Sequence, residues 1–309
     1  MTAVTHLKSL QALELAVRVG TLQSAARELA ISPAAVGQRI KSLEDFLGVD
    51  LLSRNRSGLK PTPALENALP HLSVAFRELS SAAEQLDLQR INEIHIAANS
   101  DFAELWLAPR LPAFKKRHPN VAFNINGEGE APLRVGAPDC TIAFAAPTDD
   151  TELLFRDYLA AMTSPQNAER LKPLRRKNAL EGFPLLHLDF YKDDPDALNW
   201  PQWIERHGFK RTAPARGIRY QRIAPALDAA LSDAGFLICG AALLLPLLAD
   251  GKIINLYPKK PVGWTAFAFN ARFRATAMNR PIVKKFRGWL MEEAQATRKK
   301  LDWLAGENG

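Results

Sequence analysis

The spacing of apolar residues changes near residue 90 of this 309-residue chain, and the change constrains the possible folds. Before it, apolar residues recur every three or four positions, which is typical of one face of a helix. After it, short alternating runs such as Glu93 to Ala98 are separated by helical stretches, which predicts open, largely parallel sheets with crossover helices. The sequence therefore predicts an N-terminal helical domain followed by a larger α/β part of two lobes.

Composition favours a folded protein and excludes several classes. Hydrophobic residues make up 47% of the chain. The longest nearly apolar run, Phe236 to Ala249, is too short for a membrane span of about 20 residues, and Met1 to Leu10 lacks the apolar core of a secretory signal. We therefore expect a cytoplasmic protein with no membrane partner. Two cysteines build no disulfide framework, and the six histidines have no metal-ligand spacing, so we expect no metal and no cofactor.

Three short helices are expected before residue 48. The first runs from Leu7 to Gly20, and Thr21 can cap the second. Ser32 is a good N-cap for the third, because Pro33 suits the first helical position. The core face of this third helix is expected at positions spaced by three and four, namely Val36, Ile40, Leu43 and Leu47.

A basic hairpin and a long helix are expected next. The segment from Arg54 to Lys60 contains a Ser-Gly turn, which predicts a wing. Thr62 and Pro63 form a second cap-plus-proline start. Pro70 is expected to kink the helix that follows. Its apolar positions keep a period of 3.5 residues from Leu65 to Leu86, which is typical of a dimerisation seam.

The three helices and the hairpin are typical of a winged helix-turn-helix, in which the third helix enters the major groove of DNA. Gln38, on the face opposite the core, is the obvious base reader, because a glutamine can pair with the edge of adenine. The alternative for each charged residue is a solvated surface, and the net charge of +7 does not identify the binding face. The predicted DNA-binding residues are Ser32, Pro33, Ala34, Gly37, Gln38, Arg39, Lys41, Arg54 and Arg56.

Several motifs resemble those of LysR-type transcriptional regulators. They are Ser24-Ala25-Ala26, Ser32-Pro33, Leu43-Glu44 and Leu51-Leu52-Ser53-Arg54 at the front of the chain, with looser likenesses at Leu107-Ala108-Pro109 and Phe286-Arg287-Gly288-Trp289-Leu290. Leu185-Leu186-His187, Trp200 and Trp203 resemble the branch of glycine-cleavage and β-lactamase regulators. The chain departs from the family at Gly37, where many members have serine, and at Leu65, where the linker usually has glycine.

The resemblance implies an α/β protein with an N-terminal winged helix-turn-helix, a long linker helix and a two-lobed, periplasmic-binding-protein-like α/β effector domain. The implied domains are residues 1–60, 61–91 and 92–309. Lobe I comprises about 92–160 and 262–309, and lobe II about 161–261. The implied function is sequence-specific transcriptional regulation of a double-stranded DNA operator in response to a small-molecule effector. The resemblance also implies a homodimer or homotetramer, and it allows RNA polymerase as a further partner.

An effector would bind between the lobes, at strand ends and helix N-termini. The expected residues are Ser100, Asp101, Glu128, Thr163, Ser164, Arg219, Tyr220 and Gln221. Ser100 and Asp101 can instead simply cap a helix reaching about His118, and Tyr220 can be a core aromatic. Arginines from Arg206 to Arg222 favour an anionic effector if one points inward, although a solvated face is the favoured reading. Asp101 and Glu128 favour an amine or amino acid instead.

No catalytic motif is present, and we expect no enzyme. Cys140 and Cys239 have no electropositive neighbours in sequence, which favours inert buried thiols over redox sensing. One alternative is a solute-binding or enzymatic α/β protein whose N-terminal helices only mediate oligomerisation. Another is a regulator that has lost effector control. The sequence leaves open the effector, the operator, the regulated genes and the choice between activation and repression.

Overall fold

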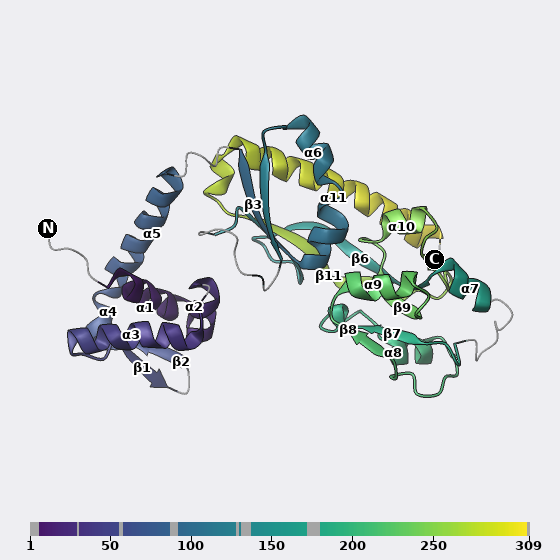
Figure 1. The fold of residues 1–309 in the computed structure, drawn as a ribbon, viewed down its shortest axis with the longest axis horizontal. Coiled ribbons are helices and arrows are strands. Elements are labelled where there is room, and N and C mark those ends of the chain that lie inside the picture. Colours follow the sequence, from purple (N-terminus) through teal and green to yellow (C-terminus); the bar gives the residue numbers. More distant parts are fainter. Residues whose placement is uncertain are drawn as a thin grey trace. The chain divides into compact units, whose positions relative to one another are not determined.

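The structure is a computed structural model that describes residues 6–29, 31–55, 58–86, 92–127, 130, 137–171 and 180–307. These residues form two compact units, one within residues 6–86 and one within residues 92–307 (Figure 1). Each unit has its own cluster of buried apolar side chains. In the described part of the chain, no helix combines the length and the apolar character needed to cross a membrane.

The first unit contains the three predicted helices, α1 (Leu7–Val19), α2 (Leu22–Leu29) and α3 (Pro33–Leu47). The predicted caps are confirmed. The hydroxyl of Thr21 accepts a hydrogen bond from the backbone N–H of Ser24 at 3.0 Å. The hydroxyl of Ser32 accepts one from Ala35 at 3.1 Å.

The core face of α3 agrees with the prediction except at its end. Val36, Ile40 and Leu43 are buried, whereas Leu47 is 48% exposed. Leu47 is the last residue of α3 and the chain turns at Gly48, which has a left-handed φ of 68°. The apolar periodicity of α3 therefore continues one turn beyond the part of the helix that packs against the core.

The predicted hairpin forms from β1 (Leu52–Asn55) and β2 (Gly58–Pro61), which pair antiparallel. The predicted long helix is interrupted close to Pro70, where a kink was expected, and the interruption divides it in two. The chain forms α4 (Pro63–Glu66) and, after a break, α5 (Leu69–Leu86), with Pro70 in the first turn of α5. The break at Asn67 and Ala68 lies in the turn before Pro70, which has no N–H to donate to the carbonyl of Glu66 and whose ring crowds that carbonyl.

The predicted side-chain cap at Thr62 is wrong. Its hydroxyl donates instead to the backbone oxygen of Asp50 at 2.8 Å, so it fixes the loop before the hairpin. Along α5, Val74 and Leu79 are 47% and 50% exposed. Exposed apolar side chains of this kind are what a dimerisation seam requires.

The second unit is built on one sheet in the order β4-β3-β5-β11-β6-β9-β7-β8, with β10 paired to β6. Its strands are β3 (Glu93–Ala98), β4 (Ala122–Gly127), β5 (Cys140–Ala145), β6 (Glu152–Thr163), β7 (Leu185–Leu188), β8 (Ile218–Tyr220), β9 (Phe236–Gly240), β10 (Ile254–Asn255) and β11 (Gly263–Phe273). The helical segments are η2 (Phe102–Leu107), α6 (Leu111–Arg117), α7 (Pro165–Leu171), η4 (Asp189–Tyr191), α8 (Trp200–Arg206), α9 (Ile223–Leu231), α10 (Leu245–Ala249), η5 (Ala277–Asn279) and α11 (Pro281–Glu307).

The sheet has two parallel ends joined by antiparallel strands. We call the end built on β3, β4 and β5 lobe I and the end built on β7, β8 and β9 lobe II. The strands β6 and β11 pair antiparallel with each other and with their neighbours on either side. The expectation of largely parallel sheets therefore holds within each lobe but not at the centre, where the lobes share one hydrogen-bonded sheet.

An aromatic cluster fills the interior of lobe I. The ring centroid of Phe102 lies 4.8 Å from that of Trp106 and 5.2 Å from that of Phe269 on β11. The indole N–H of Trp106 donates to Thr297 of α11 at 3.0 Å. These contacts fix η2, and with it the residues that precede η2, against the sheet.

Candidate functional sites

The exposed face of α3 is the face predicted to read DNA. Ala34, Gln38 and Lys41 are exposed on it, together with Asp45, while Arg39 is half-buried beside them. The ammonium group of Lys41 lies 3.2 Å from the carboxylate of Asp45, and this hydrogen bond raises the pKa of Lys41. Exposed pairs of this kind are weak, so Lys41 can exchange Asp45 for a phosphate.

Gly37 has room for a side chain within the first unit. A Cβ atom built there would meet only the Cδ1 of Leu22, at 3.8 Å, which is an ordinary contact. Packing inside the unit therefore does not require glycine. Glycine costs a helix interior about 1 kcal/mol relative to alanine, and no contact within the first unit offsets that cost.

The wing is held to α3 by a residue that the sequence analysis did not select. One carboxylate oxygen of Glu44 accepts hydrogen bonds from the backbone N–H groups of Leu51 at 2.8 Å and Leu52 at 3.2 Å. Arg54 lies in β1 opposite Leu59, whereas Arg56 lies outside the described residues. Glu44 belongs to the Leu43-Glu44 motif of the LysR resemblance, but nothing in the local sequence indicated that it anchors the wing.

A cavity of about 500 Å³ lies between the two lobes. Lobe I contributes the residues that follow β3 and two residues of β5, namely Asn99, Ser100, Asp101, Ala143 and Phe144. Lobe II contributes η4, its following residue and the segment before α9, namely Asp189, Phe190, Lys192, Gln221 and Arg222. Three of the predicted effector residues, Ser100, Asp101 and Gln221, therefore line one cavity.

The sequence allowed Asp101 to cap its own helix, but its side chain does not do so. The side chain of Asn99 does so, accepting hydrogen bonds from the backbone N–H groups of Asp101 at 3.1 Å and Phe102 at 3.2 Å. The predicted helix to His118 is also divided, into the π-helical η2 and the separate α6. The carboxylate of Asp101 is thereby free to bond elsewhere, and it does so across the cavity wall, in lobe II.

Arg222 connects the same two segments. One of its guanidinium nitrogens lies 3.2 Å from Asp101 and 2.9 Å from Glu104. Burial of Arg222 opposes its charge, but the two carboxylates outweigh burial and raise the pKa of Arg222. Arg222 is thus a charged link between the lobes at the edge of the cavity.

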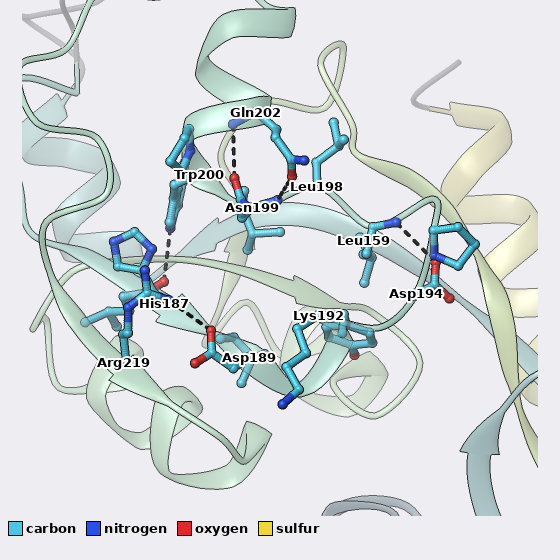
Figure 2. Close-up of a pocket in the computed structure, with 17 residues that line it drawn as sticks. Leu159, His187, Asp189, Lys192, Asp194, Leu198, Asn199, Trp200, Gln202 and Arg219 are labelled. Carbon is cyan, nitrogen blue, oxygen red and sulfur yellow. Dashed lines mark hydrogen bonds and ion pairs between the residues drawn. The ribbon is translucent and has the colours of Figure 1, made fainter.

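A second cavity, of about 260 Å³, lies within lobe II (Figure 2). Arg219 lines it, and its guanidinium lies 3.1 Å from the carboxylate of Asp189. Figure 2 shows Trp200, whose indole N–H donates to the backbone of Leu186 at 3.0 Å, and the capping pair Asn199 and Gln202 at the start of α8. Arg219 therefore lies beside this smaller cavity and does not line the one between the lobes.

The remaining predicted effector residues line neither cavity. Thr163 and Ser164 are buried, and the hydroxyl of Thr163 donates to the backbone oxygen of Gly235 at 3.2 Å. Ser164 hydrogen-bonds to Asp233 and accepts from the backbone N–H of Asn167, in the first turn of α7. Tyr220 packs against the apolar core, in agreement with the core alternative, and Glu128 lies outside the described residues.

Most arginine and lysine side chains from Arg206 to Arg222 are exposed, as the favoured reading held, and Arg211 alone among them is half-buried. Arg206 and Arg211 donate to backbone oxygens, including Val262 at 3.2 Å and Phe183 at 2.7 Å. Arg219 and Arg222 are in ion pairs. Sequence alone could not identify these partners, because they lie on other strands and loops.

A buried carboxylate lies where the shared strands meet lobe II. Asp157 of β6 accepts hydrogen bonds from the hydroxyl of Tyr191 and the backbone N–H of Ala242, both at 2.9 Å. Burial outweighs these hydrogen bonds and raises the pKa of Asp157 to about 6. Sequence analysis missed Asp157, because its neighbours on β6 are mostly apolar and its partners are distant in the chain.

Cys140 and Cys239 are free thiols inside the sheet. Burial raises the pKa of both thiols well above the usual value, which keeps them protonated. The thiolate is the reactive form, so both environments favour the inert alternative. Among the described residues, no cluster of histidine, cysteine and carboxylate side chains could hold a metal ion.

Comparison with known proteins decides the family. Residues 7–65 match the bacterial regulatory helix-turn-helix protein of the lysR family, and residues 89–295 match the LysR substrate binding domain. The chain belongs to the LysR family of transcriptional regulators. The LysR resemblance of the N-terminal motifs and the predicted fold class are thereby confirmed. The chain is a LysR-type DNA-binding transcriptional regulator with an effector-binding domain, and the solute-binding or enzymatic alternative is not favoured.

Individual relatives are similar over most of the LysR chain. The glycine cleavage system transcriptional activator of Escherichia coli (strain K12) is 25% identical over 300 residues, which cover 95% of each protein. The transcriptional activator AmpR of Rhodobacter capsulatus is 29% identical over 253 residues, 80% of this chain and 84% of that one. The first agrees with the resemblance to the branch of glycine-cleavage regulators.

Solved structures show the same fold. A full-length variant of AphB has 18% identity and a TM-score of 0.51, covering 92% of this chain and 98% of that one. An effector binding domain from Citrobacter freundii has 20% identity and a TM-score of 0.51, covering 66% of this chain and 99% of that one. The second likeness is limited to the LysR effector domain.

Proposed function

We propose that this LysR regulator reads its operator with the exposed face of α3 and makes additional contacts to the DNA with the wing. The supporting observation is the exposure of Gln38 on the helix that Ser32 caps, opposite the buried side chains of Val36 and Ile40. Glutamine can form paired hydrogen bonds with adenine, and each such pair contributes roughly 1–3 kcal/mol of discrimination. Ser32, Pro33, Ala34, Gly37, Arg39, Lys41, Arg54 and Arg56 are the accompanying contacts in this proposal.

We further propose that two copies associate through the exposed stripe of α5 and bind an inverted repeat, as a dimer or a pair of dimers. The domain boundaries of this proposal are 1–60, 61–91 and 92–309. A two-fold protein requires half-sites about 34 Å, or a multiple of that distance, apart along the DNA. Its place of action in this proposal is the cytoplasm, with RNA polymerase as a partner where binding activates transcription.

Selection from random double-stranded DNA tests the reading face. Full-length wild-type protein should enrich an inverted repeat. Gln38→Ala should relax the preference at one base position in each half-site, whereas Gln11→Ala, an exposed glutamine on α1, should leave the motif unchanged. Failure of wild-type protein to enrich any motif would sink the proposal.

We propose that the cavity between the lobes is the effector site, with Ser100, Asp101 and Gln221 on its walls. Its support is its volume of about 500 Å³ and its position where strand ends of both lobes converge. The small molecule remains to be found by thermal unfolding across a metabolite panel. Ala143→Trp should fill the cavity and abolish the stabilisation by any hit, whereas Ala249→Trp, at an exposed position on α10, should retain it. A hit that is unaffected by Ala143→Trp binds elsewhere.

A further inference from the structure

The carboxylate of Asp101 occupies the N-terminus of α9. Its two oxygens accept hydrogen bonds from the first backbone N–H groups of that helix, Ile223 at 2.7 Å and Ala224 at 3.0 Å. Free N–H groups at a helix N-terminus favour a bound anion. Asp101 is 1% exposed, so this anion is a buried side chain of the protein itself.

The contact joins the two lobes. Asp101 precedes η2 in lobe I, whereas Ile223 and Ala224 begin a helix of lobe II. Arg222 adds its ion pairs with Asp101 and Glu104 to the same contact. The cationic group nearest to α9 is therefore already paired with two carboxylates of lobe I.

An anionic ligand would meet an unfavourable environment at this end of the cavity. It could reach the α9 amides only by displacing Asp101, which would break two hydrogen bonds and an ion pair. The displaced carboxylate and Glu104 would then lie beside the incoming negative charge, and like charges in a partly buried site repel strongly. Lys192 lines the same cavity, and the structure gives it no ion pair among the described residues.

We propose that Asp101 is a specificity-determining residue of the effector cavity. Its carboxylate occupies the anion-binding N-terminus of α9, so the effector presents an uncharged or cationic group there. The inference rests on the proposed effector site between the lobes. It separates the role of Asp101 from that of Lys192, which remains available to an acidic group elsewhere on the ligand.

Formate is the probe, because Asp101→Ala removes a carboxylate of that size from the α9 N-terminus. Thermal unfolding of the full-length protein is measured in sodium formate and in sodium chloride of equal concentration. For wild-type protein the two salts should give the same Tm. For Asp101→Ala, formate at about ten times its Kd should raise Tm by about 3 °C over chloride and should saturate. Calorimetric titration should detect formate binding to the variant alone.

Glu104→Gln is the matched control. It removes a carboxylate that contacts the same guanidinium but leaves Asp101 on the α9 amides, so formate should have no effect. An equal response of wild-type protein and Asp101→Ala to formate would overturn the proposal. If Asp101→Ala does not fold in chloride, refolding yield is the measurement. Rescue by formate and acetate supports the proposal, and the absence of rescue by either anion contradicts it.

The test does not depend on DNA binding or on the identity of the effector. If DNA selection and the Ala143→Trp result support the proposed function while Asp101→Ala gains no formate site, only the present inference is wrong. If a metabolite hit is acidic and its stabilisation of wild-type protein is lost in Ala224→Pro, which removes one α9 amide, the assignment of Asp101 is also wrong. Proline is tolerated in the first turn of a helix, so that variant keeps α9.

Discussion

Asp157 is a buried carboxyl whose pKa is raised by burial from 3.8 to about 6. In the unfolded chain the group ionises near 3.8, so between these values the folded protein holds the proton more tightly. The stabilisation from the protonated group is complete below about pH 4 and is lost as the pH rises through about 6. The loss corresponds to about 3 kcal/mol of the free energy of unfolding.

We expect Asp157→Asn to remove this pH dependence, because an amide does not titrate. Urea unfolding of the second unit at several values between pH 4 and pH 7 would measure it. Wild-type protein should lose stability relative to Asp157→Asn as the pH rises. Asp193→Asn, an exposed carboxyl exchanged in the same way, should keep the wild-type profile. Parallel profiles for wild-type protein and Asp157→Asn would contradict the assignment.

Gly37 gives a prediction in which stability and DNA binding move in opposite directions. Gly37→Ala should raise the free energy of unfolding of the first unit by about 1 kcal/mol, because the helix gains and the added Cβ meets only an ordinary contact. Urea unfolding checks the gain, and a DNA-binding titration checks whether affinity falls.

Gly48→Ala is the contrasting variant for the same measurement. Gly48 has a left-handed φ of 68°, so alanine there should lower stability although nothing lies within 4 Å of the added atom. If Gly37→Ala lowers the stability of the first unit as Gly48→Ala does, the prediction that Gly37 costs α3 helix propensity is wrong.

Individual residues also show where sequence reasoning ends. The Ser32 cap was predictable because donor and acceptor lie three residues apart, at a spacing that every helix start repeats. The partners of Asp101 lie 122 and 123 residues away, so no local pattern could identify them. The choice between Asn99 and Asp101 as the cap of η2 was equally hidden, since both side chains suit the task.

Among the elements, the wing depends on a side chain of α3. Glu44→Ala would leave the backbone N–H groups of Leu51 and Leu52 without their acceptor. We expect a loss of about 1–3 kcal/mol in the stability of the first unit and weaker DNA binding, because unsatisfied amides are costly and the hairpin loses its anchor. Urea unfolding and a DNA titration measure the two effects.

The neighbouring Asp45→Ala is the control for that measurement. Asp45 is exposed, and the one ion pair that it forms among the described residues is with Lys41, across one turn of α3. Its removal should change stability by no more than about 0.5 kcal/mol. A similar loss in both variants would mean that Glu44 acts through helix charge and not through the wing.

The elements were predicted best where the signal is local. The caps at Thr21 and Ser32, the hairpin and the strand β3 agree with their sequence patterns. Pro70 indicated a disruption of the helix after Thr62, but the apolar period continues through the break and did not show that the helix ends at Glu66. The antiparallel centre of the sheet was likewise hidden, since strand order depends on contacts far apart in the chain.

In the whole molecule, the two units have separate buried clusters, and we expect two unfolding transitions in calorimetry. Leu43→Ala should lower the transition of the first unit by about 2–5 kcal/mol and leave the other in place, because the side chain packs only in that core. Phe102→Ala should do the reverse, with a loss of about 3–5 kcal/mol. A single transition that both variants shift equally would contradict separate folding.

The strands β6 and β11 are common to both lobes, and their register changes between Trp264 and Ala268, opposite Asp157. Asp194 accepts hydrogen bonds from the backbone N–H groups of Ala266 and Phe267, which the irregularity leaves unpaired. Bulges increase local twist and bend a strand. Pulling the lobes straight apart would break the ladders of the shared sheet, whereas rotating one lobe about the strand direction changes a few dihedral angles at the bulge. The effector domain is therefore built to respond by torsion, and the angle between its lobes is the variable on which a ligand can act.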